Sequence, residues 1–374
     1  MRFLFTCGGT AGHIYPAVGV AEKLAELYPG SEFLFVGARG MMETELVPRE
    51  GYRIETVTIT NIHRSLKPKE ILHNLKTVKN VFAATHQAKR IISEFNPDVA
   101  IGTGGYVCYP VLRAAHSMGI PTLVHESNAV PGLTTKLLSK IVDCVMVGFE
   151  DAKKNYDSGI RVEFVGTPVR EQFTSLDKAQ ARRELGIDEG KRLVLSVWGS
   201  LGSEYMNGVM TELIAIDAEK KDFALIHSAG KKRYPRMKAA LDEKAPGFEK
   251  ADIDVRPYIY DMPKVMAAAD VIICRSGAST LGELTALGRP AVLIPSPNVT
   301  GNHQEKNARV LEKQGAAVVL LEGEFTPETL YDELCTLLKD SERCKKMSDA
   351  MLASGLPDSA ERIASLVMEL AEKK

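Results

Sequence analysis

Short apolar runs alternate with segments of helical periodicity along the whole chain, and this alternation constrains the fold more than any other feature. The predicted strands are residues 2–7, 31–37, 53–59, 98–102, 121–125, 142–148, 162–165, 192–198, 223–229, 253–259, 271–275, 291–295 and 316–321, and the predicted helices include 17–27, 69–94, 133–140 and 303–313. Several strands, such as 193–198, lack polar alternation, which is typical of strands covered on both faces. Repeated strand–helix–strand order predicts an α/β protein with parallel sheets wound right-handed.

The strands are too many for one open sheet, since twisted sheets rarely exceed about 10 strands. A length of 374 residues also suits two domains of roughly 150–200 residues each. A polar, helix-prone stretch follows residue 170, so we place the linker near 166–172. We predict an N-terminal domain at 1–168, a C-terminal domain at 169–350, and a helix at 351–374 that crosses back toward the first domain. Ligands bind beyond the carboxyl ends of parallel strands, so two such sheets predict an interdomain cleft.

The composition argues against several classes of function. The formal net charge is −1 and aromatic residues make up 6%, so neither a basic field nor stacking platforms point to nucleic acid. The six cysteines show no Cys-x-x-Cys pair and no zinc-ligand spacing, so we expect buried thiols, a reducing compartment and no metal site. No apolar run approaches the ~20 residues of a bilayer span, and the N-terminus lacks a signal-peptide pattern. We therefore expect a soluble, cytoplasmic protein.

Glycine-rich loops follow three of the predicted strands, at 8–12, 102–105 and 199–202. Glycine lets the backbone approach a ligand closely, and the N–H groups of a following helix favour an anion. Three such loops indicate two phosphorylated ligands or one large one. The first loop does not match the dinucleotide fingerprint G-x-G-x-x-G, because position 7 is Cys, and the chain has no G-x-x-x-x-G-K-[ST] motif. These departures argue against a dinucleotide oxidoreductase and a P-loop ATPase.

A further strand, 271–275, leads through 276–278 into a predicted helix. The N-terminus of this helix favours an anion, and the hydroxyl groups of Ser279 and Thr280 lie in its first turn. Glu283 follows on the same helix face, since residues three or four apart are neighbours. A carboxylate there can accept hydrogen bonds from both hydroxyls of a ribose, so the segment indicates a nucleoside diphosphate. The alternative interpretation of Glu283 is a solvated helix carboxylate without a ligand.

Several motifs, in this order, resemble those of the MurG family of bacterial N-acetylglucosamine transferases. They are 8–17 (Gly-Gly-Thr-Ala-Gly-His-Ile-Tyr-Pro-Ala), 102–107 (Gly-Thr-Gly-Gly-Tyr-Val), 125–128 (His-Glu-Ser-Asn), 166–170 (Gly-Thr-Pro-Val-Arg), 275–278 (Arg-Ser-Gly-Ala) and 302–308 (Asn-His-Gln-Glu-Lys-Asn-Ala). The resemblance covers nearly the whole chain and implies a two-domain GT-B fold and a metal-independent, inverting enzyme without a cofactor. It also implies transfer of N-acetylglucosamine from its UDP donor to the lipid-linked muramyl-pentapeptide of peptidoglycan synthesis (lipid I to lipid II).

The resemblance also implies roles for individual residues. The donor would contact Thr10, Ala11, Gly12, Asn128, Arg170, Ser200, Ile259, Ala278, Ser279, Thr280, Leu281, Glu283, His303 and Gln304. Within this set Glu283 would hold the ribose, the backbone at Ile259 the uracil, and the helix end at 278–281 the phosphates. The acceptor pyrophosphate would face Gly9, Gly104, Gly105 and Tyr106. Ala11, Trp198 and the segment 61–64 depart from the family pattern, and each could alter the geometry of the acceptor site.

Inverting transfer requires a base that takes the proton of the acceptor hydroxyl. His13 is the first candidate, because it follows the first glycine loop and histidine titrates near neutral pH. The alternative is that His13 positions the loop or binds phosphate. Glu126 is a secondary candidate, together with His125, and both could equally be structural.

A basic stretch at 62–92 contains seven Lys or Arg residues and one acid, Glu70, with apolar residues interleaved at helical spacing. Such a stretch is typical of a patch that binds an anionic membrane surface. A solvated basic face over core-facing residues is the rival interpretation. Because the family acts on a lipid-linked acceptor, we expect a peripheral location on the inner face of the cell membrane.

Three other functions stay open at this point. A diacylglycerol glycolipid synthase would share the fold and the donor, whereas a UDP-N-acetylglucosamine epimerase would need no lipid and no basic patch. A non-catalytic UDP-sugar sensor would bind the donor without turnover, and the presence of both His13 and Glu283 argues against it.

Overall fold

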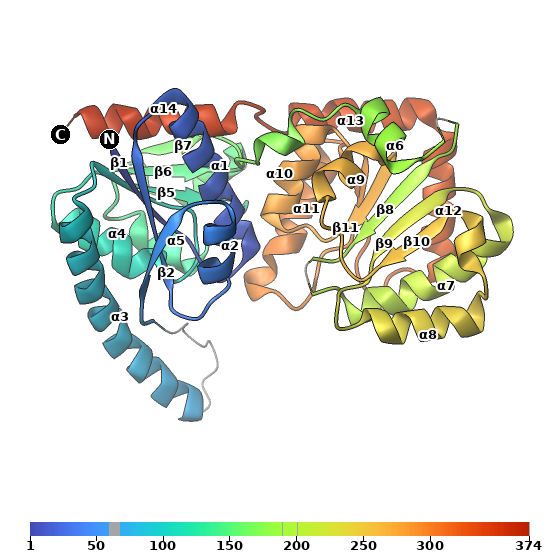
Figure 1. Cartoon of the computed structure of the whole chain (residues 1–374), viewed down its shortest axis with the longest axis horizontal. Coiled ribbons are helices and arrows are strands. Elements are labelled where there is room, and N and C mark those ends of the chain that lie inside the picture. The colour runs from blue at the N-terminus through green and yellow to red at the C-terminus, as the bar shows by residue number, and fades with distance from the viewer. Residues whose placement is uncertain (60–67, 189, 200, 374) are drawn as a thin grey trace. The chain divides into compact units, whose positions relative to one another are not determined.

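The computed structural model describes residues 1–59, 68–188, 190–199 and 201–373, and of residues 68–79 and 300 it describes the backbone alone. The chain forms two compact units (Figure 1). Unit 1 comprises Met1–Arg170 together with Pro357–Lys374, and unit 2 comprises Glu171–Leu356. The described residues include no helix that is both long and apolar enough to cross a membrane.

Unit 1 is built on a parallel sheet of seven strands in the order β3-β2-β1-β4-β5-β6-β7. The strands are β1 (Arg2–Thr6), β2 (Glu32–Ala38), β3 (Arg53–Val57), β4 (Val99–Gly102), β5 (Thr122–Glu126), β6 (Cys144–Val147) and β7 (Val162–Phe164). The helices are α1 (Ala11–Leu27), α2 (Glu43–Arg49), α3 (Pro68–Phe95), α4 (Cys108–Ser117), α5 (Leu133–Leu138) and α14 (Ser359–Glu372), and a 3₁₀ turn covers Glu150–Asn155. Every predicted strand of the first domain is confirmed.

Alternation along β1 explains why both faces of this sheet are covered. Phe3 and Phe5 point into a core made with α1, α2 and α14. Leu4 points into the opposite core, made with α3, α4 and α5. Successive side chains of a strand face opposite sides, so an unbroken apolar run requires helices on both. In Figure 1, α14 lies beside α1, and Ile363 and Val367 are buried with it in the first core.

Unit 2 contains a parallel sheet of six strands in the order β10-β9-β8-β11-β12-β13. The strands are β8 (Leu193–Val197), β9 (Ala224–Ser228), β10 (Ile253–Arg256), β11 (Val271–Cys274), β12 (Ala291–Leu293) and β13 (Ala317–Val319). The helices are α6 (Lys178–Leu185), α7 (Glu204–Lys220), α8 (Tyr234–Lys244), α9 (Met262–Ala268), α10 (Ala278–Leu287), α11 (His303–Lys313), α12 (Pro327–Lys339) and α13 (Ser341–Ala353), with 3₁₀ turns at Glu171–Phe173, Phe248–Ala251 and Thr300–Asn302. The predicted strands of this domain are also confirmed.

Helix boundaries differ from prediction where glycine obscures the periodicity. The helix predicted at 17–27 begins at Ala11, directly after the first glycine loop. Helix α11 (His303–Lys313) has the predicted bounds. The first turn of α1 carries Gly12 and His13 rather than apolar residues, so its sequence resembles a loop although its backbone is helical.

Candidate active site

The first glycine loop and the loop after β4 are locked together at the carboxyl edge of the unit 1 sheet. The backbone N–H of Gly8 donates to the carbonyl of Gly104 at 3.2 Å. Gly105 has φ of +91°, and a Cβ atom there would lie 2.3 Å from the carbonyl oxygen of Gly8. Only glycine permits this approach. Helices α1 and α4 therefore begin side by side, and their N-termini both favour an anion here.

Glu43 fixes this arrangement and was missed by sequence reasoning. Its side chain is fully buried and accepts hydrogen bonds from the N–H of Gly9 at 3.1 Å and of Ala38 at 2.9 Å. A Cβ atom at Gly8 or Gly37 would lie within about 2.5 Å of the Glu43 side chain. The carboxylate thus ties the first glycine loop to the end of β2. A lone Glu at the start of a short helix carries no sequence signal for this role.

His13 lies in the first turn of α1, beside both loops. Its Nδ1 is 2.9 Å from the carbonyl oxygen of Gly8 and 3.3 Å from the hydroxyl of Thr10. A carbonyl only accepts, so in the neutral ring Nδ1 carries the proton and Nε2 keeps its lone pair. The ring also packs against Gly104, where a Cβ atom would lie 2.5 Å from His13 Cδ2. The geometry therefore gives His13 the tautomer that a base requires.

Tyr106, Thr103 and Thr10 complete the surroundings of these loops. The Tyr106 ring lies over Gly9, since a Cβ atom there would be 3.7 Å from its edge. The hydroxyl of Thr103 donates to the carbonyl of His13 at 2.6 Å. Thr10 is exposed, and Gly9 and Ala11 are half-buried beside it. The structure thus brings together the predicted acceptor-side residues of unit 1.

The carboxylate of Glu126, the second candidate base, accepts hydrogen bonds from the loop that follows it. One oxygen accepts from the backbone N–H of Asn128 at 3.0 Å and from its side-chain amide at 2.8 Å, and the other accepts from the N–H of Gly132 at 2.9 Å. The carboxylate is 5% exposed. These three hydrogen bonds support a role of Glu126 in positioning Asn128 and the loop that follows it.

His125 is also held by structural contacts. Its Nε2 donates to the carbonyl of Gly166 at 2.8 Å, and the hydroxyl of Ser127 donates to its Nδ1 at 3.2 Å. Burial lowers the pKa of His125 below its ordinary value. A neutral ring with both nitrogens bonded joins β5 to the segment after β7.

Arg170, the last residue of the first segment of unit 1, packs against α1. Its guanidinium carbon lies 4.4 Å from the centre of the Tyr15 ring, a distance typical of a cation–π contact. One turn along α1, a Cβ atom at Gly19 would lie 3.1 Å from the carbonyl of Val169. The small residue at position 19 therefore lets the segment before Arg170 run close to the helix.

In unit 2 the N-terminus of α10 faces the start of α11. Ser276, which is fully buried, donates from its hydroxyl to the carbonyl of Gln304 at 2.8 Å. Asn307 donates to the carbonyl of Ser276 at 3.3 Å. The side-chain oxygen of Gln304 accepts from the N–H of Ser296 at 2.9 Å, so the amide nitrogen of Gln304 is its donor end. These bonds hold the two helix starts together.

The predicted phosphate contacts in the first turn of α10 differ in whether their backbone N–H groups are available to a ligand. Leu281 is buried, and its N–H already donates to the carbonyl of Gly277 at 3.0 Å. The N–H groups of residues 278–280 precede the first helical acceptor and are the ones that can reach an anion. Glu283 is half-buried on the same helix, and Ile259 is buried after β10. His303 opens α11, whereas Ser200 and the segment 61–64 lie outside the described residues.

Arg275 and Trp198 form a second feature that sequence reasoning missed. Arg275 donates to the carbonyl of Ile294 at 2.9 Å, and it pairs with Glu322. Its guanidinium carbon lies 5.4 Å from the centre of the Trp198 ring. It also donates to the hydroxyl of Ser203 at 3.1 Å. Trp198 thus stacks with the arginine that joins the loops after β8, β11 and β12, which explains a large side chain at this position.

A chain of hydrogen bonds runs inward from Trp198. The indole N–H donates to the hydroxyl of Ser196 at 2.9 Å, and that hydroxyl lies 2.9 Å from His227 Nδ1. On the other side of the ring, His227 Nε2 lies 3.3 Å from the side-chain oxygen of Asn207. Asn207 donates in turn to the carbonyl of Ala229 at 2.9 Å. All donors and acceptors match only if His227 is neutral and protonated on Nε2.

This buried histidine predicts a pH dependence of the stability of unit 2. Burial lowers the pKa of His227 to about 3, whereas an unfolded histidine titrates near ~6.5. Between these two pH values the unfolded chain binds a proton that the native chain does not. The free energy of unfolding is therefore highest above pH ~6.5 and falls as the pH drops, by up to about 1.4 kcal/mol per pH unit.

Trp198 is the single tryptophan of the chain, so its fluorescence in urea titrations reports unit 2. We expect the unfolding free energy to fall between pH 6.5 and pH 5 in the wild type and to vary less in His227→Gln. Equal slopes for the two proteins would contradict the role of His227.

Among the described residues, no group of three or more His, Cys, Asp or Glu side chains could hold a metal ion.

Comparisons with known proteins identify the family of this chain. The N-terminal domain model of glycosyltransferase family 28 matches residues 3–147, and its C-terminal domain model matches residues 193–363. The chain is 42% identical over 374 residues to a UDP-N-acetylglucosamine–N-acetylmuramyl-(pentapeptide) pyrophosphoryl-undecaprenol N-acetylglucosamine transferase of Acetivibrio thermocellus, covering 100% of this chain and 99% of the relative.

Two solved structures have similar folds but differ in how similar their sequences are to this chain. Acinetobacter baumannii MurG superposes with a TM-score of 0.73 at 26% identity, covering 98% of this chain and 99% of its own. A putative UDP-N-acetylglucosamine 2-epimerase of Listeria monocytogenes reaches a TM-score of 0.70 at 16% identity, covering 100% and 97%. The second likeness shows the GT-B fold and nothing more. With two matched family models and a full-length relative, this chain belongs to glycosyltransferase family 28 and, within it, to the MurG family.

Proposed function

We propose that this protein transfers N-acetylglucosamine from UDP-N-acetylglucosamine to the muramyl sugar of an undecaprenyl-pyrophosphoryl-muramyl-pentapeptide, with inversion at the donor's anomeric carbon. The observation that carries the proposal is the 42% identity over the full chain to a relative named for this transfer. The placement of His13 between two anion-favouring loops supports it.

Unit 1 holds the acceptor in this proposal. The two helix N-termini and the loop residues Gly9, Gly104 and Gly105 provide N–H groups for its pyrophosphate, and Tyr106 covers Gly9. His13 takes the proton of the attacking hydroxyl through Nε2, while its Nδ1–H bond to the carbonyl of Gly8 stabilises the imidazolium that forms. In the same proposal Thr10, Ala11, Gly12, Asn128 and Arg170 remain donor contacts contributed by unit 1.

Unit 2 holds the donor. The N–H groups of residues 278–280 bind the phosphates and stabilise the charge that develops on UDP as the glycosidic bond breaks. Glu283 accepts from the ribose hydroxyls and the backbone at Ile259 contacts uracil. The amide nitrogen of Gln304, with its oxygen held by Ser296 and with His303 beside it, donates to sugar hydroxyls. These groups supply charge stabilisation without any step through a metal.

The deciding assay supplies UDP-N-acetylglucosamine with and without the lipid-linked acceptor and follows UDP and sugar products. We expect UDP release that depends on the muramyl-pentapeptide acceptor. A new UDP-sugar formed without acceptor would identify an epimerase instead, and turnover on diacylglycerol alone would identify a glycolipid synthase. Donor binding without turnover on any acceptor would identify a sensor.

Glu283→Ala tests the ribose contact. Hydrogen bonds to a charged group contribute about 1.5–3 kcal/mol each, so removal of two should raise the donor KM by at least about a hundredfold. The donor KM of Glu283→Gln should lie between those of the wild type and Glu283→Ala, because the Gln side chain keeps one neutral acceptor. Glu219→Ala, at an exposed position of α7, is the control. Steady-state kinetics with varied donor measures the effect, and an unchanged KM would refute the ribose role.

We also propose that unit 1 binds an anionic membrane surface through α3. The side chains of 62–79 lie outside the described part of the chain, but Phe82 is 63% exposed, and Lys89 and Arg90 are exposed on the same helix. Cosedimentation with vesicles containing phosphatidylglycerol should weaken on charge reversal at Lys67, Lys69 and Lys76. Binding that is insensitive to these changes would favour the rival interpretation, a solvated basic face.

A further inference from the structure

A basic cavity of about 220 Å³ lies at the amino-terminal edge of the unit 2 sheet. This edge is remote in topology from the carboxyl edge where α10 begins, because Arg192 precedes β8, Asp270 precedes β11 and Arg289 precedes β12. The charged residues that line the cavity are Lys178 on α6, Arg192, Arg289, Lys345 on α13, and Asp270. The lining thus carries four cations and one carboxylate.

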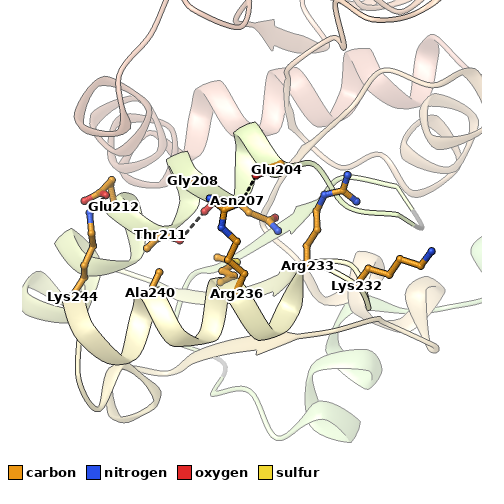
Figure 2. Close-up of a pocket in the computed structure, with 11 residues that line it drawn as sticks. Glu204, Asn207, Gly208, Thr211, Glu212, Lys232, Arg233, Arg236, Ala240 and Lys244 are labelled. Atoms are coloured by element: carbon orange, nitrogen blue, oxygen red, sulfur yellow. Dashed lines mark hydrogen bonds and ion pairs between the residues drawn. The ribbon is translucent and has the colours of Figure 1, made fainter.

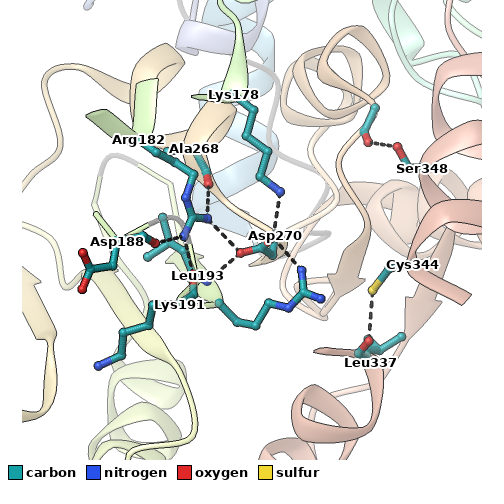
Figure 3. Close-up of polar contacts among 12 residues, drawn as sticks. Lys178, Arg182, Asp188, Lys191, Leu193, Ala268, Asp270, Leu337, Cys344 and Ser348 are labelled. Atoms are coloured by element: carbon teal, nitrogen blue, oxygen red, sulfur yellow. Dashed lines mark hydrogen bonds and ion pairs between the residues drawn. The ribbon is translucent and has the colours of Figure 1, made fainter. Parts of the chain in front are cut away.

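Asp270 is fully engaged by groups around it, as Figure 3 shows. One oxygen accepts from Lys178 at 2.7 Å and from Arg192 at 3.5 Å. The other accepts from Arg182 at 3.1 Å and from the backbone N–H of Leu193 at 2.7 Å. Burial alone would raise the pKa of Asp270, but the bonds from Lys178 and Leu193 outweigh it and hold the pKa below its ordinary value. The single carboxylate of the cavity has no acceptor capacity left for a further cation.

Arg289 is the cation that this carboxylate does not reach. Its Nε is buried, and no hydrogen-bond acceptor for it lies among the residues that the structure describes. Asp270 and Asp177 act on it only through space, and burial lowers the pKa of Arg289. A partly buried guanidinium without an acceptor is costly unless an anion compensates it. Lys345 faces solvent as well and pairs there with Asp349.

The groove between α7 and α8 offers a contrast. It is larger, about 520 Å³, and Figure 2 shows its two ion pairs. Arg236 reaches Glu204 and Lys244 reaches Glu212, each across the two helices. The lining of the larger groove thus carries four cations and two carboxylates, and both carboxylates are paired across the helices, whereas the cavity at the sheet edge carries four cations and one carboxylate. The volume of a cavity alone does not indicate a ligand site, whereas an excess of positive charge indicates a site for an anion.

We propose that this cavity binds a tetrahedral oxyanion of the phosphate type, held by Arg289, Lys178, Arg192 and Lys345. Arginine and lysine pair with phosphate oxygens through charge-assisted hydrogen bonds. The hydroxyl of Ser341 lines the same cavity and can donate as well. A bound anion would link α6, the start of β12 and α13, where the hydroxyl of Ser348 already donates to the carbonyl of Gly288 at 2.6 Å.

Calorimetric titration of the whole protein with inorganic phosphate, and separately with pyrophosphate, tests this site. UDP is kept saturating so that the proposed donor site is filled, and the titration is repeated without UDP. We expect saturable anion binding in the presence of UDP, weakened at least about tenfold by Arg289→Gln. Arg183→Gln is the matched control, because Arg183 is exposed on α6 and does not line the cavity.

Arg289→Gln should fold, since its Nε has no acceptor to lose, and the Trp198 unfolding transition verifies this. Lys345→Glu provides an independent variant on the exposed rim and should weaken binding severalfold. No saturable binding beside UDP, or equal affinity in the wild type and both variants, would overturn the proposal. Binding seen only without UDP would place the anion at the α10 end instead, and would leave the proposed transfer reaction untouched.

Discussion

His13→Ala should lower kcat by about 10²–10⁴-fold, the range that a positioned general base contributes. The reason is that Nδ1 donates to the carbonyl of Gly8 and leaves Nε2 as the proton acceptor. The donor KM should change little, because the donor contacts that we assign to unit 2 are intact. Steady-state rates with the lipid-linked acceptor at saturating donor measure the effect.

His13→Asn separates the base from the structural alternative. The Asn side-chain amide can still donate toward the carbonyl of Gly8, but it offers no basic nitrogen at the Nε2 position. A base role predicts that His13→Asn is as slow as His13→Ala. Recovery of activity in the Asn variant would show that His13 only positions the loop. His116→Ala, at an exposed histidine on α4, controls for loss of an imidazole elsewhere in unit 1.

Gly105→Ala should destabilise unit 1 by about 2–4 kcal/mol and separate the two glycine loops. The added Cβ atom would lie 2.3 Å from the carbonyl oxygen and 2.9 Å from the carbonyl carbon of Gly8, at a residue with φ of +91°. The neighbour is backbone and cannot rotate away, so the loops must part. Because the same loops carry the proposed pyrophosphate contacts, kcat should fall as well, by more than about tenfold.

Gly119→Ala is the matched control for backbone conformation. Gly119 also has a positive φ, +73°, but no atom lies within 4 Å of the position that an added Cβ would take. It therefore incurs the conformational penalty alone, about 1 kcal/mol. Scanning calorimetry measures the transition of unit 1, while Trp198 fluorescence should show unit 2 unchanged. Equal destabilisation in the two variants would contradict the close-approach argument for Gly105.

The order of strands and helices could be predicted because its signals are local. An apolar run such as 193–198 indicates a strand covered on both faces, and His303–Lys313 shows its helical period over its whole length. The glycine loops and the start of α10 could also be found, since each lies directly after a strand. The boundary of α1 was missed because its first turn is glycine-rich and polar.

The contacts within the site could not be predicted, because they join segments distant along the chain. Glu43 reaches Gly9 across 34 residues, and nothing local marks it. Arg275 meets the Trp198 ring only because β8 and β11 are neighbours in the sheet, and it meets Glu322 because β13 lies in the same sheet on the far side of β12. Glu126 ends an apolar strand, where a catalytic base could lie, yet its oxygens are engaged by Asn128 and Gly132.

The sequence by itself determined the α/β plan, the two-sheet organisation, the glycine loops and the family resemblance, since periodicity and short motifs are properties of neighbouring residues. The tertiary structure alone decided which side chains hold those loops, which tautomer His13 adopts and where unmatched charge gathers around Arg289. The physical reason is that hydrogen-bond partners and charge balance depend on sheet order and register, which bring together residues that no local pattern connects.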